Sequence, residues 1–200
     1  MFDSTKVSLG IAPIGWCNDD MPELGGECTF RQIVSEMALA GFSGCEIGNK
    51  YPSDAETLKR ELELRGMRIA SRWFSSFILT QSIEQVRSDF LRELNFLAAV
   101  GANRINVSEQ SYSIQGQMDT PVLADRRHIM NDREWRRLCE GLNHLGKLAR
   151  SAALSCASTT TWAPWFRRLR RPIVFWRTPI PNTYSCATTP ATLPLLARIR

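Results

Sequence analysis

Short apolar runs alternate with amphipathic segments along the first 150 residues of the chain. The apolar runs contain β-branched residues and predict strands at 7–13, 44–48, 67–74 and 104–109. In the segments that follow, apolar residues recur every three or four positions, which predicts helices at 30–40, 53–66, 82–101 and 131–150. The pattern therefore indicates four strand–helix units in succession.

Each predicted helix begins with a capping signal, a Thr, Ser or Asn followed three residues later by Gln or Glu. The pairs are Thr29 and Gln32, Ser53 and Glu56, Ser82 and Gln85, and Asn131 and Glu134. Gly66 and Gly101 are placed to end the second and third helices. The apolar positions expected to face the core are Ile33, Met37, Leu58, Leu62, Ile83, Val86, Phe90, Leu94, Leu97, Trp135, Leu138, Leu142, Leu145 and Leu148.

Alternating strands and amphipathic helices are typical of a parallel sheet covered by helices. We expect an α/β fold in which residues 1–150 form the N-terminal half of a (β/α)₈ TIM barrel, whose active-site face is built by the loops after the strands. Those loops lie at 15–20, 49–52, 74–76 and 108–121. A doubly wound sheet is the alternative. It usually has a Gly-rich phosphate loop after its first strand, and IAPIGWCND at 11–19 is not one.

Composition divides the 200-residue chain near Arg150. Residues 1–150 contain 18 Lys or Arg and 20 Asp or Glu, whereas residues 151–200 contain seven Arg and no Lys, Asp, Glu or Gly. The chain has no apolar stretch of membrane-spanning length and no signal peptide pattern, so we expect a cytoplasmic protein without a membrane partner. Its six cysteines form no CxxC pair, which favours reduced thiols over a zinc or disulfide framework.

Four strings in the first 150 residues resemble the inosose dehydratase family of xylose-isomerase-like barrels. They are GIAPIGWCNDDMPELGGE at 10–27, SEMALAGFSGCEIGNKYP at 35–52, LELRGMRIASRWFSSF at 62–77 and VSEQSYSIQGQMDTP at 107–121. The resemblance covers about residues 8–150. It implies a lyase that removes water from 2-keto-myo-inositol in inositol catabolism, helped by a divalent metal such as Co²⁺ or Mn²⁺. A sugar isomerase or epimerase of the same superfamily is an alternative, as is a non-catalytic fragment.

The loss of water next to a ketone requires removal of a proton and protonation of the departing hydroxyl. Glu46 and Glu109 each end a predicted strand, so we predict that both are catalytic, against the alternative of salt-bridged loop carboxylates. Polar residues in the same loops are expected to bind the hydroxyls of a polyol ketone, unless they only cap their loops: Asn18, Asn49, Lys50 and Gln110. Aromatic residues in or next to these loops are candidates to pack on the ring of the substrate, unless they lie in the core: Trp16, and Trp73 or Phe74.

No metal site is assigned within residues 1–150. The resemblance implies ligands from a later HHHMGT run and a DTGH run, which this chain lacks. His128 lies in the basic loop DRRH and His144 on the polar side of the last predicted helix, so both are poor ligand candidates. This chain is therefore expected to bind no metal and to be inactive by itself.

Residues 151–200 are interpreted as an out-of-frame tail with little regular structure. With a suitable choice of synonymous codons, the DNA for Ala157 to Pro164 reads as IHHHMGT in a shifted reading frame. The DNA for Ala187 to Thr192 reads as YDTGH in the same shifted frame. Out-of-frame translation also explains the basic segment FRRLRR at 166–171, so no nucleic-acid partner is expected. Half a barrel leaves the edges of the first and fourth strands open, so we expect homo-oligomers or aggregates.

Overall fold

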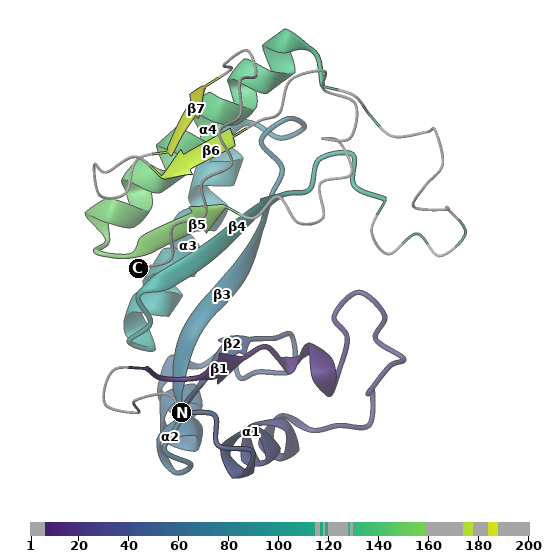
Figure 1. Ribbon diagram of the computed structural model, residues 1–200, viewed down its shortest axis with the longest axis vertical. Coiled ribbons are helices and arrows are strands. Elements are labelled where there is room, and N and C mark those ends of the chain that lie inside the picture. The colour runs from purple at the N-terminus through teal and green to yellow at the C-terminus, as the bar shows by residue number, and fades with distance from the viewer. Residues whose placement is uncertain are drawn as a thin grey trace, which may run out of the picture.

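Five parallel strands form the central sheet of the protein, in the order β1-β2-β3-β4-β5 (Figure 1). This computed structural model describes residues 7–114, 117, 119, 128 and 130–158, together with the backbone of 174–177 and 184–187. The strands of the sheet are β1 (Gly10–Ile11), β2 (Gly44–Ile47), β3 (Arg68–Ser76), β4 (Arg104–Glu109) and β5 (Ser155–Ser158).

Four helices connect successive strands: α1 (Phe30–Leu39), α2 (Ala55–Glu63), α3 (Ile83–Ala99) and α4 (Asp132–Ser151). Because crossovers between parallel strands are right-handed, this simple strand order places all four helices on one face of the sheet. The predicted α/β architecture of successive βα units is confirmed. None of the described helices combines the length and the apolar character that a membrane span requires.

The helix ends follow the capping signals closely. Thr29, Ser82 and Asn131 accept hydrogen bonds from the backbone N–H groups of their helices, as predicted. The second helix differs by one residue, since its N-cap is Asp54, whose carboxylate accepts the Thr57 N–H at 2.8 Å. Gly66 and Gly101 take φ values of 64° and 76° directly after their helices, a conformation that costs glycine little.

The first strand is shorter than the predicted 7–13. Only Gly10 and Ile11 pair with β2, and a 3₁₀ turn begins at Pro13. Proline lacks the N–H that a strand would donate to its neighbour, so the ladder ends before this residue.

The fifth strand is an element that the sequence pattern did not reveal. Ser155–Ser158 pairs in parallel with β4, so the edge of β4 that we expected to be open is covered. Within the remaining tail, β6 (Val174–Arg177) and β7 (Tyr184–Ala187) form a two-stranded antiparallel sheet. Three strands therefore lie in the part of the chain that was expected to have little regular structure, and for the rest of the tail this expectation lies outside the described residues.

The core fills the space between the sheet and the helices. Its buried residues include Ile33, Met37, Leu58, Leu62, Val86, Phe90, Leu94, Leu97, Leu138, Leu142 and Leu145, as the helical periodicity predicted. Ile83, in the first turn of α3, is 41% exposed instead, and Trp135 and Leu148 are half-buried. The opposite face of the sheet carries Glu46, Ser71 and Asn106, so it is polar.

Candidate active site

A cavity of about 550 Å³ opens at the carboxyl ends of the first strands. Several polar residues that line it lie in or just after the ends of the strands: Asp19, Asp20, Glu46, Asn49, Ser75 and Gln110. Parallel α/β folds place their active sites at this end, because the loops from several strands meet there. The cavity therefore lies where catalytic chemistry is expected. It brings together three of the predicted site residues, Glu46, Asn49 and Gln110.

A β-bulge positions Glu46 on the polar face of the sheet. Glu46 pairs with Ser71 because Ala70 is an extra residue on β3 at this point. The Asn106 amide donates to Glu46 Oε1 at 3.2 Å and to Ser71 Oγ at 3.3 Å. The second carboxylate oxygen accepts no hydrogen bond from the described residues, so it is free to act on a molecule in the cavity.

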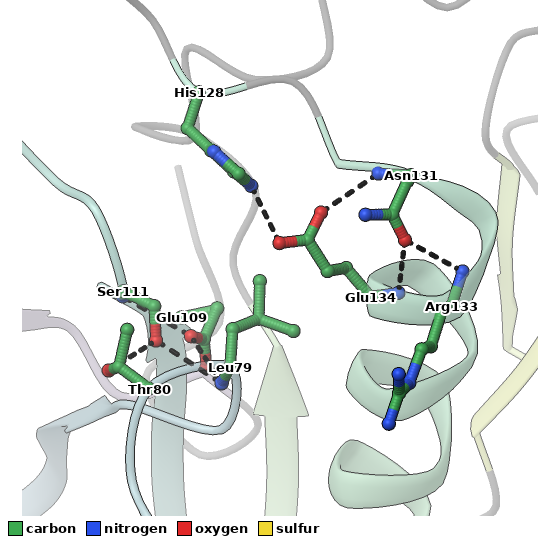
Figure 2. Close-up of polar contacts among 8 residues, drawn as sticks. All are labelled: Leu79, Thr80, Glu109, Ser111, His128, Asn131, Arg133 and Glu134. Carbon is green, nitrogen blue, oxygen red and sulfur yellow. Dashed lines mark hydrogen bonds and ion pairs between the residues drawn. The ribbon is translucent and has the colours of Figure 1, made fainter.

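The Glu109 carboxylate joins the loops that follow β3 and β4 (Figure 2). One oxygen accepts from Ser76 Oγ at 2.8 Å and from the Ile78 N–H at 3.0 Å. The other accepts from the N–H groups of Leu79 at 3.4 Å and Ser111 at 3.2 Å. Glu109 is not among the residues that line the cavity. With four donors on its two oxygens, it holds two strand-end loops together.

Lys50 and Asn18, both expected to bind hydroxyls, make contacts with the backbone of the loop after β1. Lys50 Nζ donates to the carbonyls of Gly25, Gly26 and Cys28 at 2.7 to 2.8 Å. Asn18 Oδ1 accepts the backbone N–H groups of Asp20 at 2.9 Å and of Met21 at 3.0 Å. Neither residue lines the cavity, and these contacts correspond to the loop-capping alternative.

The aromatic candidates lie in three different places. Trp16 donates its indole N–H to Glu36 of α1 at 2.6 Å, and it does not line the cavity. Hydrogen bonds from Gln32 and from Trp16 hold the pKa of Glu36 below its ordinary value. Trp73 does line the cavity, whereas Phe74 is buried and packs edge-on against Phe90 of α3.

Asn49 and Gln110 are the two hydroxyl-binding candidates that line the cavity. The Asn49 side chain lies at the cavity wall, while its backbone N–H donates to Asp19 at 3.3 Å. Gln110 Nε2 donates to Ser108 Oγ at 2.9 Å, which fixes the orientation of the amide. Both amides offer the donors and acceptors that a polyol requires.

His128 and Glu134 form a separate polar cluster above the sheet (Figure 2). His128 Nε2 lies 2.9 Å from Glu134 Oε1, and its ring packs on Tyr112 with centroids 4.1 Å apart. The backbone N–H of Asn131 and the His128 contact lower the pKa of Glu134. His144 differs from the expected surface histidine, because its Nε2 is buried without a hydrogen-bond partner in the described part of the chain.

The described residues do not fit the divalent metal that the resemblance implies. Among them, no three His, Cys, Asp or Glu side chains are grouped so that they could hold a metal ion. The Cys17 thiol lines the cavity, but burial raises its pKa and the Asp19 carboxylate raises it further. A protonated thiol is a poor metal ligand and a poor nucleophile. No reaction step is therefore assigned to a metal or to this cysteine.

Sequence reasoning missed several residues that shape the cavity. Asp19 and Asp20 lie in a loop that was singled out, but neither was chosen, although their carboxylates line the wall. Asn106 and Ser71 do not line the cavity, but Asn106 binds Glu46. Both lie inside strands, where polar residues at alternate positions signal a polar face. That alternation was the available signal.

Sequence comparison finds relatives that share more than half of the aligned residues. The chain is 58% identical over 149 residues to an inosose dehydratase of Clostridium botulinum (strain Eklund 17B / Type B), with 74% of this chain and 50% of the relative covered. It is 57% identical over 149 residues to an inosose dehydratase of Geobacillus thermodenitrificans, with the same coverage. The chain thus spans about half the length of these curated relatives. No family model matches it.

Solved structures of low sequence identity share the fold. A xylose isomerase-like TIM barrel protein from Mycobacterium smegmatis, solved in complex with magnesium, aligns with a TM-score of 0.54 at 17% identity, over 79% of this chain and 56% of its own. D-psicose 3-epimerase from Clostridium cellulolyticum H10 aligns with a TM-score of 0.54 at 15% identity, over 75% of this chain and 51% of its own. Over about three quarters of its length the chain is thus similar in sequence to the inosose dehydratases, and its fold is that of part of a xylose isomerase-like TIM barrel.

Proposed function

We propose that this chain carries one part of the active site of a lyase that removes water from 2-keto-myo-inositol. The observation that supports this most is the 58% identity to an inosose dehydratase over 149 residues. The likeness to D-psicose 3-epimerase, at 15% identity, concerns the fold alone, so the epimerase alternative has less support. The substrate is a small polyol ketone, which suits a cavity of about 550 Å³ with a polar lining.

In this proposal Glu46 removes the proton from the carbon next to the ketone. Glu46 lines the cavity, and the Asn106 amide binds one oxygen of its carboxylate while the other accepts no hydrogen bond from the described residues. The electron pair of the broken C–H bond forms a carbon–carbon double bond as the hydroxyl on the neighbouring carbon departs. The protonated Glu46 then gives the proton it removed to the departing hydroxyl, which leaves as water, and the carboxylate is restored. Asn49 and Gln110 orient the ring through its other hydroxyls.

Glu109 has a different role in the proposal, that of a positioning residue. Its carboxylate accepts one hydrogen bond from the last residue of β3 and three from the loops after β3 and β4, and those loops form part of the cavity wall. It acts on the reaction by holding the loop that carries Gln110, and its assignment as a second catalytic carboxylate stays a prediction.

The out-of-frame origin of residues 151–200 also stays a proposal, and it bears directly on activity. Those residues lack Asp, Glu, Lys and Gly, which supports a change of reading frame near Arg150. Under this proposal the chain as given turns over no substrate, and a protein with the frame restored does. Resequencing the gene around codon 150 tests the idea. An uninterrupted frame that encodes no HHHMGT run at any offset overturns it.

The paired variants Glu46→Gln and Glu109→Gln test the two roles. In the frame-restored protein, with 2-keto-myo-inositol as substrate, we expect Glu46→Gln to lower kcat by about 100-fold or more, because it removes the base while keeping the shape. Its melting temperature should be unchanged. Glu109→Gln should lower the free energy of unfolding by about 2 kcal/mol, since an amide N–H₂ would then face backbone donors.

Three results would contradict these assignments. Full activity in the Glu46→Gln variant would remove the proposed base. Epimerisation of a ketose, with no water lost from 2-keto-myo-inositol, would favour the alternative enzyme. No turnover of either substrate by the frame-restored protein would favour a non-catalytic fragment.

A further inference from the structure

A second hollow, of about 390 Å³, lies at the opposite end of the strands from the candidate active site. Its wall contains the first residues of three strands, Gly44 of β2, Arg68 of β3 and Arg104 of β4, and the adjoining loop residues Ser43 and Asn103. The volume falls within the range of small-molecule sites. Of the residues that line this hollow, the proposed dehydratase chemistry uses only Asn106, whose amide binds Glu46.

The charge in this hollow is positive and uncompensated within the described ranges. Arg68 and Arg104 are both exposed, and neither forms an ion pair with a described carboxylate. No Asp or Glu is among the residues that line the hollow. Four other arginines do pair with carboxylates: Arg31, Arg65, Arg72 and Arg92. The two guanidinium groups of the hollow are therefore available for an anion.

The neighbouring groups suit the oxygens of a phosphate. Arg68 Nη2 lies 3.4 Å from Ser8 Oγ, so this guanidinium contacts a hydroxyl and no counter-charge. Ser71 Oγ accepts a hydrogen bond from Asn106, which leaves its own O–H to donate. The Asn103 amide adds further donors at the wall. Guanidinium groups bind phosphate through paired, charge-assisted hydrogen bonds, and hydroxyl and amide donors fill the remaining positions.

We propose that this hollow is a binding site for a small phosphate-bearing anion, held by Arg68 and Arg104. Two charge-assisted contacts at an open site correspond to a dissociation constant on the order of 1 mM for inorganic phosphate at low ionic strength. The proposal is separate from the dehydratase activity, because the two residues that hold the anion, Arg68 and Arg104, do not line the active-site cavity. Its test needs no turnover.

The site is tested by titrating the whole chain with inorganic phosphate and measuring the binding by calorimetry and by amide chemical shifts. We expect saturable binding with shifts at Gly44, Ser71 and Asn103. The double variant Arg68→Gln and Arg104→Gln should weaken binding by at least about tenfold, because it removes both charges. Since both side chains are exposed, the variant should melt at the temperature of the unchanged protein.

Arg87→Gln is the matched control, because Arg87 is exposed on α3 and does not line the hollow. It should bind phosphate as the unchanged chain does. Glycerol 3-phosphate, titrated in parallel, separates two sources of the phosphate group. Tighter binding of the ester supports a metabolite ligand, and equal binding supports free phosphate. No saturable binding, or an equal loss in Arg87→Gln and the double variant, would overturn the proposal.

Discussion

The Lys50 side chain uses all three hydrogens of its ammonium group on backbone carbonyls. Its Nζ lies 2.7 Å from Gly25 O, 2.8 Å from Gly26 O and 2.7 Å from Cys28 O. An ammonium group has three donors, so this set is complete. The segment that ends at Cys28 leads directly into α1. A single side chain after β2 therefore fixes the loop after β1.

Replacing Lys50 with Met should destabilise the protein by about 2 kcal/mol, because three carbonyls, two of them in partly buried contacts, would lose a charged donor. Urea unfolding measures the difference. Lys59→Met, at an exposed position of α2, is the control and should have little effect. If the two variants proved equally stable, the three contacts of Lys50 would contribute nothing to the fold.

At the scale of an element, α4 begins with a complete capping box. Asn131 Oδ1 accepts the N–H groups of Arg133 and Glu134, and Glu134 Oε2 accepts the Asn131 N–H at 2.9 Å (Figure 2). The second carboxylate oxygen contacts His128. The hydrogen bond from Asn131, followed by the His128 contact, lowers the pKa of Glu134 from its ordinary value of 4.5.

This lowered pKa makes the stability of the protein depend on pH in a defined direction. As the pH falls, the unfolded chain binds a proton at Glu134 before the folded chain does. The stabilisation is therefore fully present above 4.5, and it is lost as the pH falls through the lower pKa of the folded state. We expect Glu134→Gln to be less stable than the unchanged protein at pH 7, with the difference vanishing in acid.

Urea unfolding at neutral and at acidic pH measures that difference. Glu140→Gln, at an exposed position of the same helix, is the control for loss of a negative charge on α4. A stability difference between Glu134→Gln and the unchanged chain that persists in acid would show that the charge of Glu134 is not the cause.

In the whole molecule, the described residues leave two edges of the five-stranded sheet unpaired, the outer side of β5 and that of β1. The residues around this strand are apolar and accessible: Val7 is 42% exposed, Leu9 50% and Ile14 67%. An open strand edge beside exposed apolar side chains favours pairing with another chain. The other edge we expected to be open, that of β4, is occupied by β5.

The chain should therefore associate in a concentration-dependent manner through β1. Leu9→Lys should weaken this association by about tenfold, because a charge at the edge opposes strand pairing and removes an apolar contact. Sedimentation velocity over a range of concentrations measures the effect. Leu39→Lys, at an 88% exposed position of α1, is the matched control and should associate as before. A monomer at all concentrations would contradict the prediction.

The sequence by itself determined the elements and the side of each helix that is buried. Three of the four caps, at Thr29, Ser82 and Asn131, act as predicted, because capping depends on residues only a few positions apart. The residues at α3 positions 86, 90, 94 and 97 are buried because the helical period alone places them on one face. β5 escaped prediction because Ser155–Ser158 has no apolar pattern, and its place in the sheet depends on pairing with β4.

Only the tertiary structure decided which strand-end residues reach the cavity. Glu46 and Glu109 both lie at strand ends, but Glu46 shares the polar face with Asn106, whereas Glu109 is turned toward donors in two loops. Lys50 can donate to a substrate hydroxyl, as Asn49 and Gln110 can. Its ammonium group instead donates to backbone carbonyls of a loop that lies more than twenty residues away in the chain. Such partners are distant in the chain, so the local pattern that fixed the helices and strands carried no information about them.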